Sequence, residues 1–187
     1  AGPVETLRRI AADPRQLGFV TLDVLAKEAP ALGGARAFAR VRSDDTRECL
    51  LAVTRNGTLA SYDDIAAEAA RLRFLLPPKA SGSAQTFAIL QQIDAGGIAK
   101  AGSVLNAESA AEAVKLALSA EDTVAVISTV ANPHDPLFKL VAAQGGRILA
   151  VVSREILRHQ VGGEKVYFAE EVPAGQPRWL RAAATVV

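Results

Sequence analysis

The sequence predicts an α/β fold, and three features of the chain support this prediction. Short apolar segments alternate with longer amphipathic segments along most of the 187 residues. Several short segments are apolar without a break, as in Thr123–Ile127, which is typical of strands covered on both faces of a sheet. Cap and turn residues separate the two kinds of segment. Strands that alternate with helices favour βαβ crossovers and mostly parallel sheets.

Each predicted element has a local signal. Pro3 suits a first helical turn, and Val4, Leu7 and Ile10 recur at helical spacing. Ser61 with Asp64 forms a capping-box pattern ahead of an alanine-rich helix. The predicted order is helix 4–10, strand 17–20, helix 21–26 ending near Pro30, strands 37–41 and 49–54, helix from 61, strand 72–76, helix through 88–93, strand 103–105, helix 110–118, strand 123–127, helix 135–143, strand 147–152, a short helix after Ser153, and extended segments 165–169 and 183–187.

Composition excludes several classes of protein. Half of the residues are hydrophobic, which provides a core and argues against disorder. Lys and Arg total 21 and Asp and Glu total 20, and no basic stripe is present, so we expect no nucleic-acid partner. No apolar run is long enough for a membrane span, so we expect no direct membrane insertion.

The sequence gives no sign of a cofactor or of catalysis. Cys49 is the single cysteine, and we interpret it as a small buried hydrophobe in a strand. His134 and His159 lie far apart, which argues against a histidine metal site. No nucleophile elbow or P-loop is present. We therefore expect no enzyme activity, no metal and no cofactor.

Ligands of open α/β sheets bind where strands lead into helices, and the loop at Ser81-Gly82-Ser83 has that position. Helix N-terminal amides are unpaired and lie at the positive end of the dipole. Ser81, Ser83 and Thr86 add hydroxyls, and Gly82 permits close approach. This pattern suits a carboxylate or phosphate. The alternative interpretation is an ordinary cap by Ser81, and both stay open.

Two further junctions are candidates. Thr129 and Asn132 lie where the apolar strand 123–127 gives way to a polar loop. Asp135 in this loop is expected to cap the helix that begins at Pro136. Thr21 lies between a strand and a helix near the start of the chain. The predicted ligand-binding residues are Ser81, Gly82, Ser83, Thr86, Thr129, Asn132 and Thr21.

Four segments in collinear order resemble the TAXI family, the solute receptors of TRAP transporters. They are GPVETLRRIAADPRQLGFVTLDV (2–24), CLLAVTRNGTLASYDDIAAEAARLRFLLPPKASGSAQTF (49–87), the stretch from AESAAEAVKLAL to GGRILAV (107–151), and EEVPAGQPRW followed by AAATVV. In this resemblance the turn at 81–83 matches the family's ligand-contacting Gly-Ser-Gly-Thr turn. The loop 129–133 matches its Gly-x-Pro loop, and Thr21 falls at its glutamine or serine position.

The resemblance implies a type 2 periplasmic binding-protein fold with two lobes. The first lobe would comprise 1–58 and 150–187, and the second 59–149. The family has a further strand, helix and strand before the segment that begins here at Gly2, so the first lobe is expected to be incomplete at its N-terminus. The implied function is extracytoplasmic or periplasmic binding of a small carboxylate, such as glutamate or a dicarboxylate, for a membrane transporter subunit. A sensor or scaffold domain, or an enzyme on the same architecture, are the alternatives.

Overall fold

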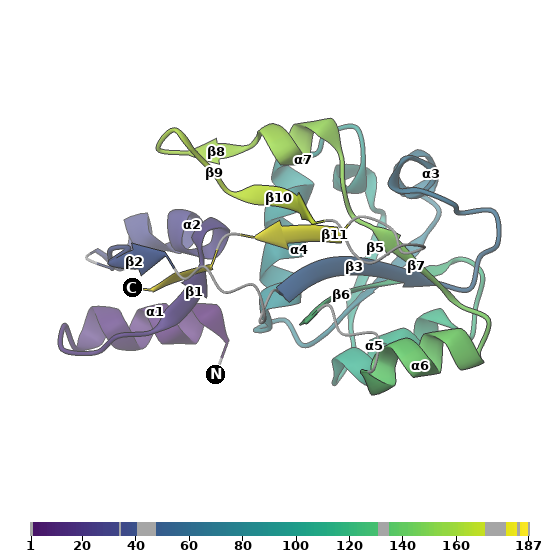
Figure 1. Cartoon of the computed structure of the whole chain (residues 1–187), viewed down its shortest axis with the longest axis horizontal. Coiled ribbons are helices and arrows are strands. Elements are labelled where there is room, and N and C mark those ends of the chain that lie inside the picture. Colours follow the sequence, from purple (N-terminus) through teal and green to yellow (C-terminus); the bar gives the residue numbers. More distant parts are fainter. Residues whose placement is uncertain are drawn as a thin grey trace.

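The computed structural model describes residues 2–33, 35–40, 48–130, 135–170, 179–182 and 184–186, and it is an α/β structure (Figure 1). Its helices are α1 (Pro3–Ala12), α2 (Leu22–Leu32), α3 (Tyr62–Glu68), α4 (Gly82–Ile93), α5 (Ala110–Ala117), α6 (Pro136–Ala143) and α7 (Arg154–Arg158), with a 3₁₀ turn at Ile98–Lys100. Its strands are β1 (Phe19–Thr21), β2 (Ala39–Arg40), β3 (Glu48–Thr54), β4 (Arg73–Leu76), β5 (Ser103–Asn106), β6 (Thr123–Val130), β7 (Arg147–Ala150), β8 (Gln160–Val161), β9 (Glu164–Lys165), β10 (Tyr167–Glu170), β11 (Trp179–Ala182) and β12 (Ala184–Val186).

Local signals in the sequence placed most of these elements. The capping box of Ser61 and Asp64 is present at α3, and Asp135 caps α6 through the amide of Leu137. The α2 helix continues two residues past Pro30 and ends at Gly33, which adopts the left-handed conformation with φ 60°. Proline in the last turn removes one amide donor, and the helix is stopped by the glycine instead.

The strands form a seven-stranded sheet, a three-stranded sheet and the β8–β9 hairpin. The large sheet has the order β10-β11-β3-β6-β4-β5, and β7 pairs with β3 beyond the end of β11. The predicted parallel pairing occurs in the β6-β4-β5 part. The pairs β10–β11, β11–β3, β3–β6 and β3–β7 are antiparallel. The sheet is therefore mixed, and the prediction of mostly parallel sheets holds for one part of it.

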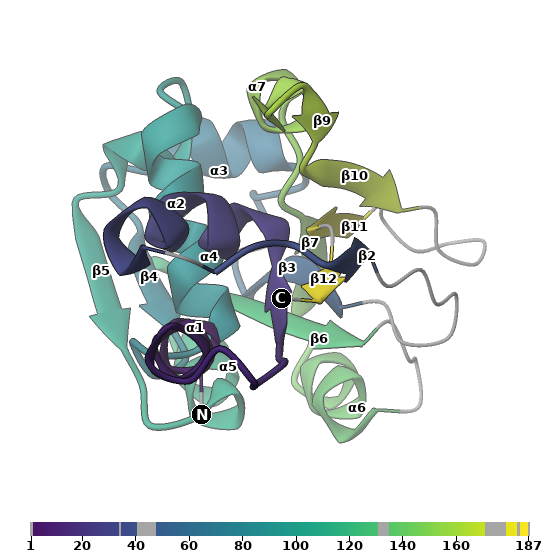
Figure 2. The same cartoon turned by 90° about the vertical axis from the view of Figure 1, so that its left-hand side faces the viewer.

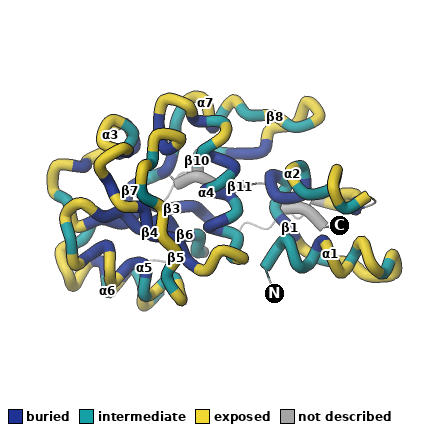
Figure 3. Tube along the Cα trace, turned by 180° about the vertical axis from the view of Figure 1, so that it is seen from behind, coloured by how far each residue is buried: buried dark blue, intermediate teal, exposed yellow. Residues whose placement is uncertain are grey.

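Helices cover both faces of the large sheet. One core cluster packs α3, α4 and α7 against it through residues such as Ile65, Phe87 and Ile156. A second cluster packs α5 and α6 against the opposite face through Val114 and Phe138, and it includes the fully buried Cys49. Figure 3 shows the buried trace running along these strands. Cys49 is thus confirmed as a core residue.

The small sheet has the order β1-β12-β2 and is antiparallel throughout. Together with α1 and α2 it encloses a third core cluster around Leu7, Val20 and Val24, to which α4 contributes Ile89. The two sheets lie beside each other, with α4 between them (Figure 1).

Strands from both predicted lobes belong to the seven-stranded sheet, and the lobe boundaries themselves stay a prediction. The strands at 48–54, 167–170 and 179–182, which the sequence analysis assigned to the first lobe, belong to the seven-stranded sheet. Among the described strands, the chain passes between the two sheets twice, once between β2 and β3 and once between β11 and β12.

Candidate anion-binding site

The beginning of α4 is the centre of the candidate site. The hydroxyl oxygen of Ser81 accepts the amide of Ala84 at 3.2 Å, so Ser81 is an N-cap. The cap orients this oxygen and leaves its hydrogen available to an acceptor, because a hydroxyl has one donor and two acceptor positions. The amides of Gly82 and Ser83 have no partner within the described part of the chain, as expected for the first turn of a helix.

Gly82 has no steric reason to be glycine in the protein alone. A Cβ built at this position meets no atom within 4 Å. Glycine in a helix is destabilising by roughly 0.5–1 kcal/mol relative to alanine. The space above Gly82 is therefore open and adjoins the unpaired amides.

Ser83 connects α4 to the end of β6. Its side chain is buried, and its oxygen accepts the amide of Ser128 at 2.8 Å. Among the described residues its hydroxyl hydrogen has no acceptor. Ser83 is thus held in place by β6 and can still donate one hydrogen bond.

Thr129 lies on the other face of the sheet from α4. It follows Ile127 by two residues and pairs with Cys49, and both of these pack with α5 and α6. Side chains two apart in a strand share a face, so the structure does not bring the Thr129 hydroxyl to Ser83. Ser128, its neighbour, faces α4 instead. Asn132 lies outside the described residues.

The hydroxyl hydrogen of Thr86, a predicted ligand-binding residue, is used within the protein. It donates to Oδ2 of Asp23 at 2.8 Å. Asp23 is only 2% exposed, and it also accepts from the Tyr167 hydroxyl at 3.0 Å and from the Val24 amide at 2.8 Å. Buried carboxylates are stable only when hydrogen-bonded in this way.

Asp23 is a buried hydrogen-bonding residue that the sequence analysis did not single out. Its signal was a carboxylate within the apolar run Val20–Leu25. Its bonds tie the first turn of α2 to α4 and β10, and therefore the small sheet's helices to the large sheet. Burial, followed by the charge of Asp23, raises the pKa of Tyr167, so this phenol stays a neutral donor.

Thr21 has an unusual environment. It precedes α2 as its N-cap residue but makes no side-chain cap bond. Its Oγ1 is the buried side-chain polar atom that has no hydrogen-bond partner among the residues that the structure describes. An unsatisfied buried group costs about 1–3 kcal/mol, so a missing partner is the natural explanation. The Asp23–Thr86 bond holds this end of α2 against the first turns of α4.

The start of α1 closes the site from a third side. A Cβ added at Gly2 would lie 1.7 Å from the carbonyl oxygen of Ala80, so the backbones touch here and only glycine fits. Figure 2 shows α1 and α2 on the near side of the molecule with α4 behind them. Gly2 thus lies against the turn that precedes α4, and the first turn of α2 is bonded to Thr86, one turn into α4.

This arrangement offers several hydrogen-bond donors. The amides of Gly82 and Ser83 and the hydroxyls of Ser81, Ser83 and Thr21 can all donate, and helix N-termini favour negative charge. No group of three metal-binding side chains occurs in the described ranges. The chemistry matches the recognition of a small anion.

Comparison with known proteins gives no family for this chain: no family model matches it, and no curated protein matches it. Within the described ranges, none of the helices is both long and apolar enough to cross a membrane.

Proposed function

We propose that this chain is a solute-binding receptor of the type 2 periplasmic class, which holds a small carboxylate at the seam between its two sheets. The observation that carries the proposal is the buried Thr21 hydroxyl without a partner among the described residues, in a segment that the Asp23–Thr86 bond joins to α4. A carboxylate accepts several hydrogen bonds at once, and the Thr21 hydroxyl and the amides of Gly82 and Ser83 lack an acceptor within the described part of the chain.

The resemblance to TAXI receptors supports the same ligand class. It points to glutamate or a dicarboxylate as the solute, to a location outside the cytoplasm, and to a membrane transporter subunit as the partner. In this proposal the protein binds and releases its ligand unchanged. Movement of the small sheet relative to the large one admits and encloses the anion.

The test is calorimetric titration of the full chain with L-glutamate and with 2-oxoglutarate. Thr21→Val removes the hydroxyl but keeps the shape, so we expect roughly tenfold weaker binding and an unchanged or higher stability without ligand. Thr58→Val, which alters an exposed hydroxyl in the turn after β3, is the matched control and should bind normally. Failure of both ligands to bind, or equal binding by all three proteins, would contradict the proposal.

A second candidate function is a sensor or scaffold domain that signals through a protein partner. The hydroxyls of Ser83 and Thr86 already contact protein atoms, and Gly2 lies against Ala80, which favours a seam that stays closed. Absence of anion binding, together with a stable closed structure, supports this candidate.

A further inference from the structure

A second polar site lies on the other side of the molecule, around α7. It is an open surface hollow of about 710 Å³. We call it the α7 hollow. Its lining consists of Asp63, Val152, Ser153, Arg154, Glu155, Leu157, Arg158, Gln160 and Lys165.

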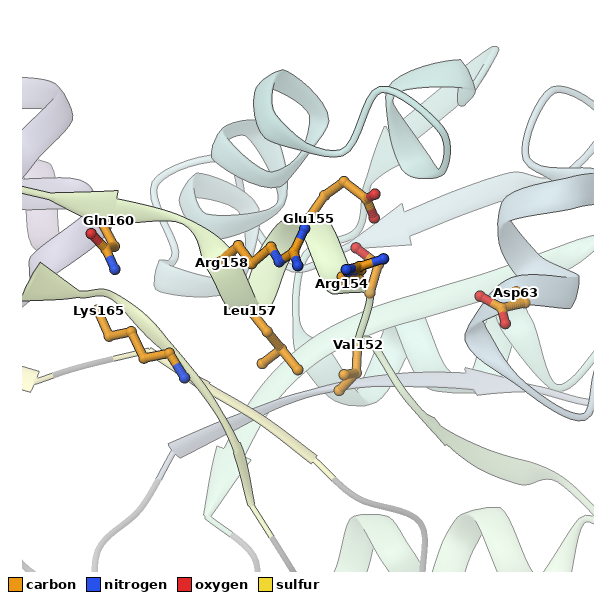
Figure 4. A pocket seen from close by; sticks show the side chains of 9 residues that line it. Asp63, Val152, Arg154, Glu155, Leu157, Arg158, Gln160 and Lys165 are labelled. Carbon is orange, nitrogen blue, oxygen red and sulfur yellow. The ribbon is translucent and has the colours of Figure 1, made fainter.

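Three cations from two elements line the α7 hollow. Arg154 and Arg158 are one turn apart on α7, and Lys165 comes from β9. All three are exposed, and within the described ranges none of them forms an ion pair. In Figure 4 the side chain of Glu155 points away from Lys165, and Asp63 lies on the opposite side of the hollow from Lys165.

The floor of the α7 hollow combines apolar and anchored polar groups. Val152 and Leu157 are half-buried between the cations. The Ser153 hydroxyl accepts the Ile156 amide at 3.2 Å and donates to Asp94 at 3.1 Å. Asp94 is 2% exposed and also accepts from Tyr62. The buried cluster therefore fixes the start of α7, and the two arginines are presented from a rigid base.

We infer that the α7 hollow is a docking surface for an acidic segment of a partner protein. Unpaired arginines recognise carboxylates with paired hydrogen bonds, and Lys165 adds a third cation from a separate element. Small-molecule sites enclose most of their ligand, whereas the charged residues here are exposed. The half-buried Val152 and Leu157 would contact apolar residues between the acids. This inference does not depend on the proposed solute.

The experiment uses fluorescence anisotropy with the full chain and the labelled peptide Gly-Glu-Asp-Leu-Glu-Asp-Phe-Glu-Asp-Gly. The same peptide with Gln and Asn in place of its acids is the control ligand. We expect the acidic peptide alone to bind, and Arg154→Glu with Arg158→Glu to weaken it about tenfold or more. Arg55→Glu with Lys139→Glu carries the same charge change on exposed residues elsewhere and should change affinity less than about twofold.

Four outcomes would overturn the inference. The first two are absence of peptide binding and equal weakening in both charge-reversed proteins. The third is displacement of the peptide by citrate at a concentration far below that of the peptide needed for binding, which indicates a small-anion site. The fourth is tighter binding to anionic phosphatidylserine vesicles than to the peptide. Lys165→Glu serves as a second variant if the arginine pair fails to fold, and it should weaken binding as well.

Discussion

The two ends of α4 differ in how many of their polar groups have a hydrogen-bond partner within the protein. At its C-terminal end Asp94 accepts from Tyr62, Ser153 and the Ile98 amide, and Gly97 is glycine because a Cβ would meet Asp94 at 2.1 Å. At its N-terminal end Gly82 has free space around it and amides stay unpaired. In a purely structural cluster the polar groups bond to one another. In a binding site some of them have no partner until the ligand binds.

Raising the pH tests the buried carboxylates near both ends of α4 at once, and it should have the largest effect on stability. Both tyrosines of the chain, Tyr62 and Tyr167, donate to buried carboxylates. Burial first, then the neighbouring carboxylate, raises the pKa of each phenol above its ordinary value of 10.0. The folded chain therefore holds these protons more tightly than the unfolded chain, and this stability is complete below pH 10.

Above about pH 10 the free energy of unfolding should fall by up to about 1.4 kcal/mol per pH unit for each tyrosine. Urea unfolding measured across this range checks the slope, and Tyr62→Phe should halve it. Phenolate absorbance that rises near pH 10 while the protein is still folded would contradict the prediction.

Asp23→Ala should be the next most damaging change. It leaves the hydroxyls of Thr86 and Tyr167 and the Val24 amide without an acceptor, at a cost of about 3 kcal/mol or more. Urea unfolding followed by circular dichroism measures this. Asp94→Ala should lower the free energy of unfolding by a similar amount. Asp63 is exposed, so Asp63→Ala should change the free energy of unfolding little. A mild effect for Asp23→Ala would show that the seam between the sheets is not held by this carboxylate.

A pair of glycine variants separates the two ends of α4 directly. Gly97→Ala introduces a clash with Asp94 and Tyr62 and should destabilise the fold by about 1–3 kcal/mol. Gly82→Ala meets open space and should stabilise the ligand-free protein by about 0.5–1 kcal/mol, while weakening carboxylate binding. The changes in the free energy of unfolding that the two substitutions cause, measured in urea, should have opposite signs. Changes of the same sign would contradict the difference between the two ends.

The smallest expected effect distinguishes capping from binding. Ser81 caps α4 and Ser109 caps α5 in the same manner. Each change to alanine should cost about 1 kcal/mol of stability, but only Ser81→Ala should reduce glutamate affinity in a titration. If both variants bind equally well, Ser81 is a cap and nothing more.

Local features of the structure were predictable from sequence, because their causes lie within a few residues. The start of α4 at Ser81 and the capping box at Ser61 follow from side chains that bond amides three residues away. The Asp23 cluster was not predictable, since its partners Thr86 and Tyr167 are 63 and 144 residues distant.

Strand direction and facing also required the structure. An apolar strand buried on both faces looks the same whether its neighbour is parallel or antiparallel, so the antiparallel pairing of β3 with β6 left no trace in composition. Thr129 and Ser128 are adjacent in sequence, but a shift of one residue reverses the face of a strand. The sequence analysis placed Thr129 after the strand 123–127, whereas β6 continues to Val130, and it did not show that Ser128 is the residue facing α4.

The pairing at the two passages between the sheets has a mechanical consequence. β2 pairs with β12 in the small sheet, and β3 pairs with β11 in the large one. The strands before and after each of the two crossings between the sheets are therefore neighbours. Because these two pairs are neighbours along the chain, the contacts between α2 and the large sheet matter for keeping the two sheets together. Separation of α2 from the large sheet would break both hydrogen bonds that Asp23 accepts from Thr86 and Tyr167. The strength of these hydrogen bonds to the buried Asp23 carboxylate would then set the free-energy cost of separating the two sheets.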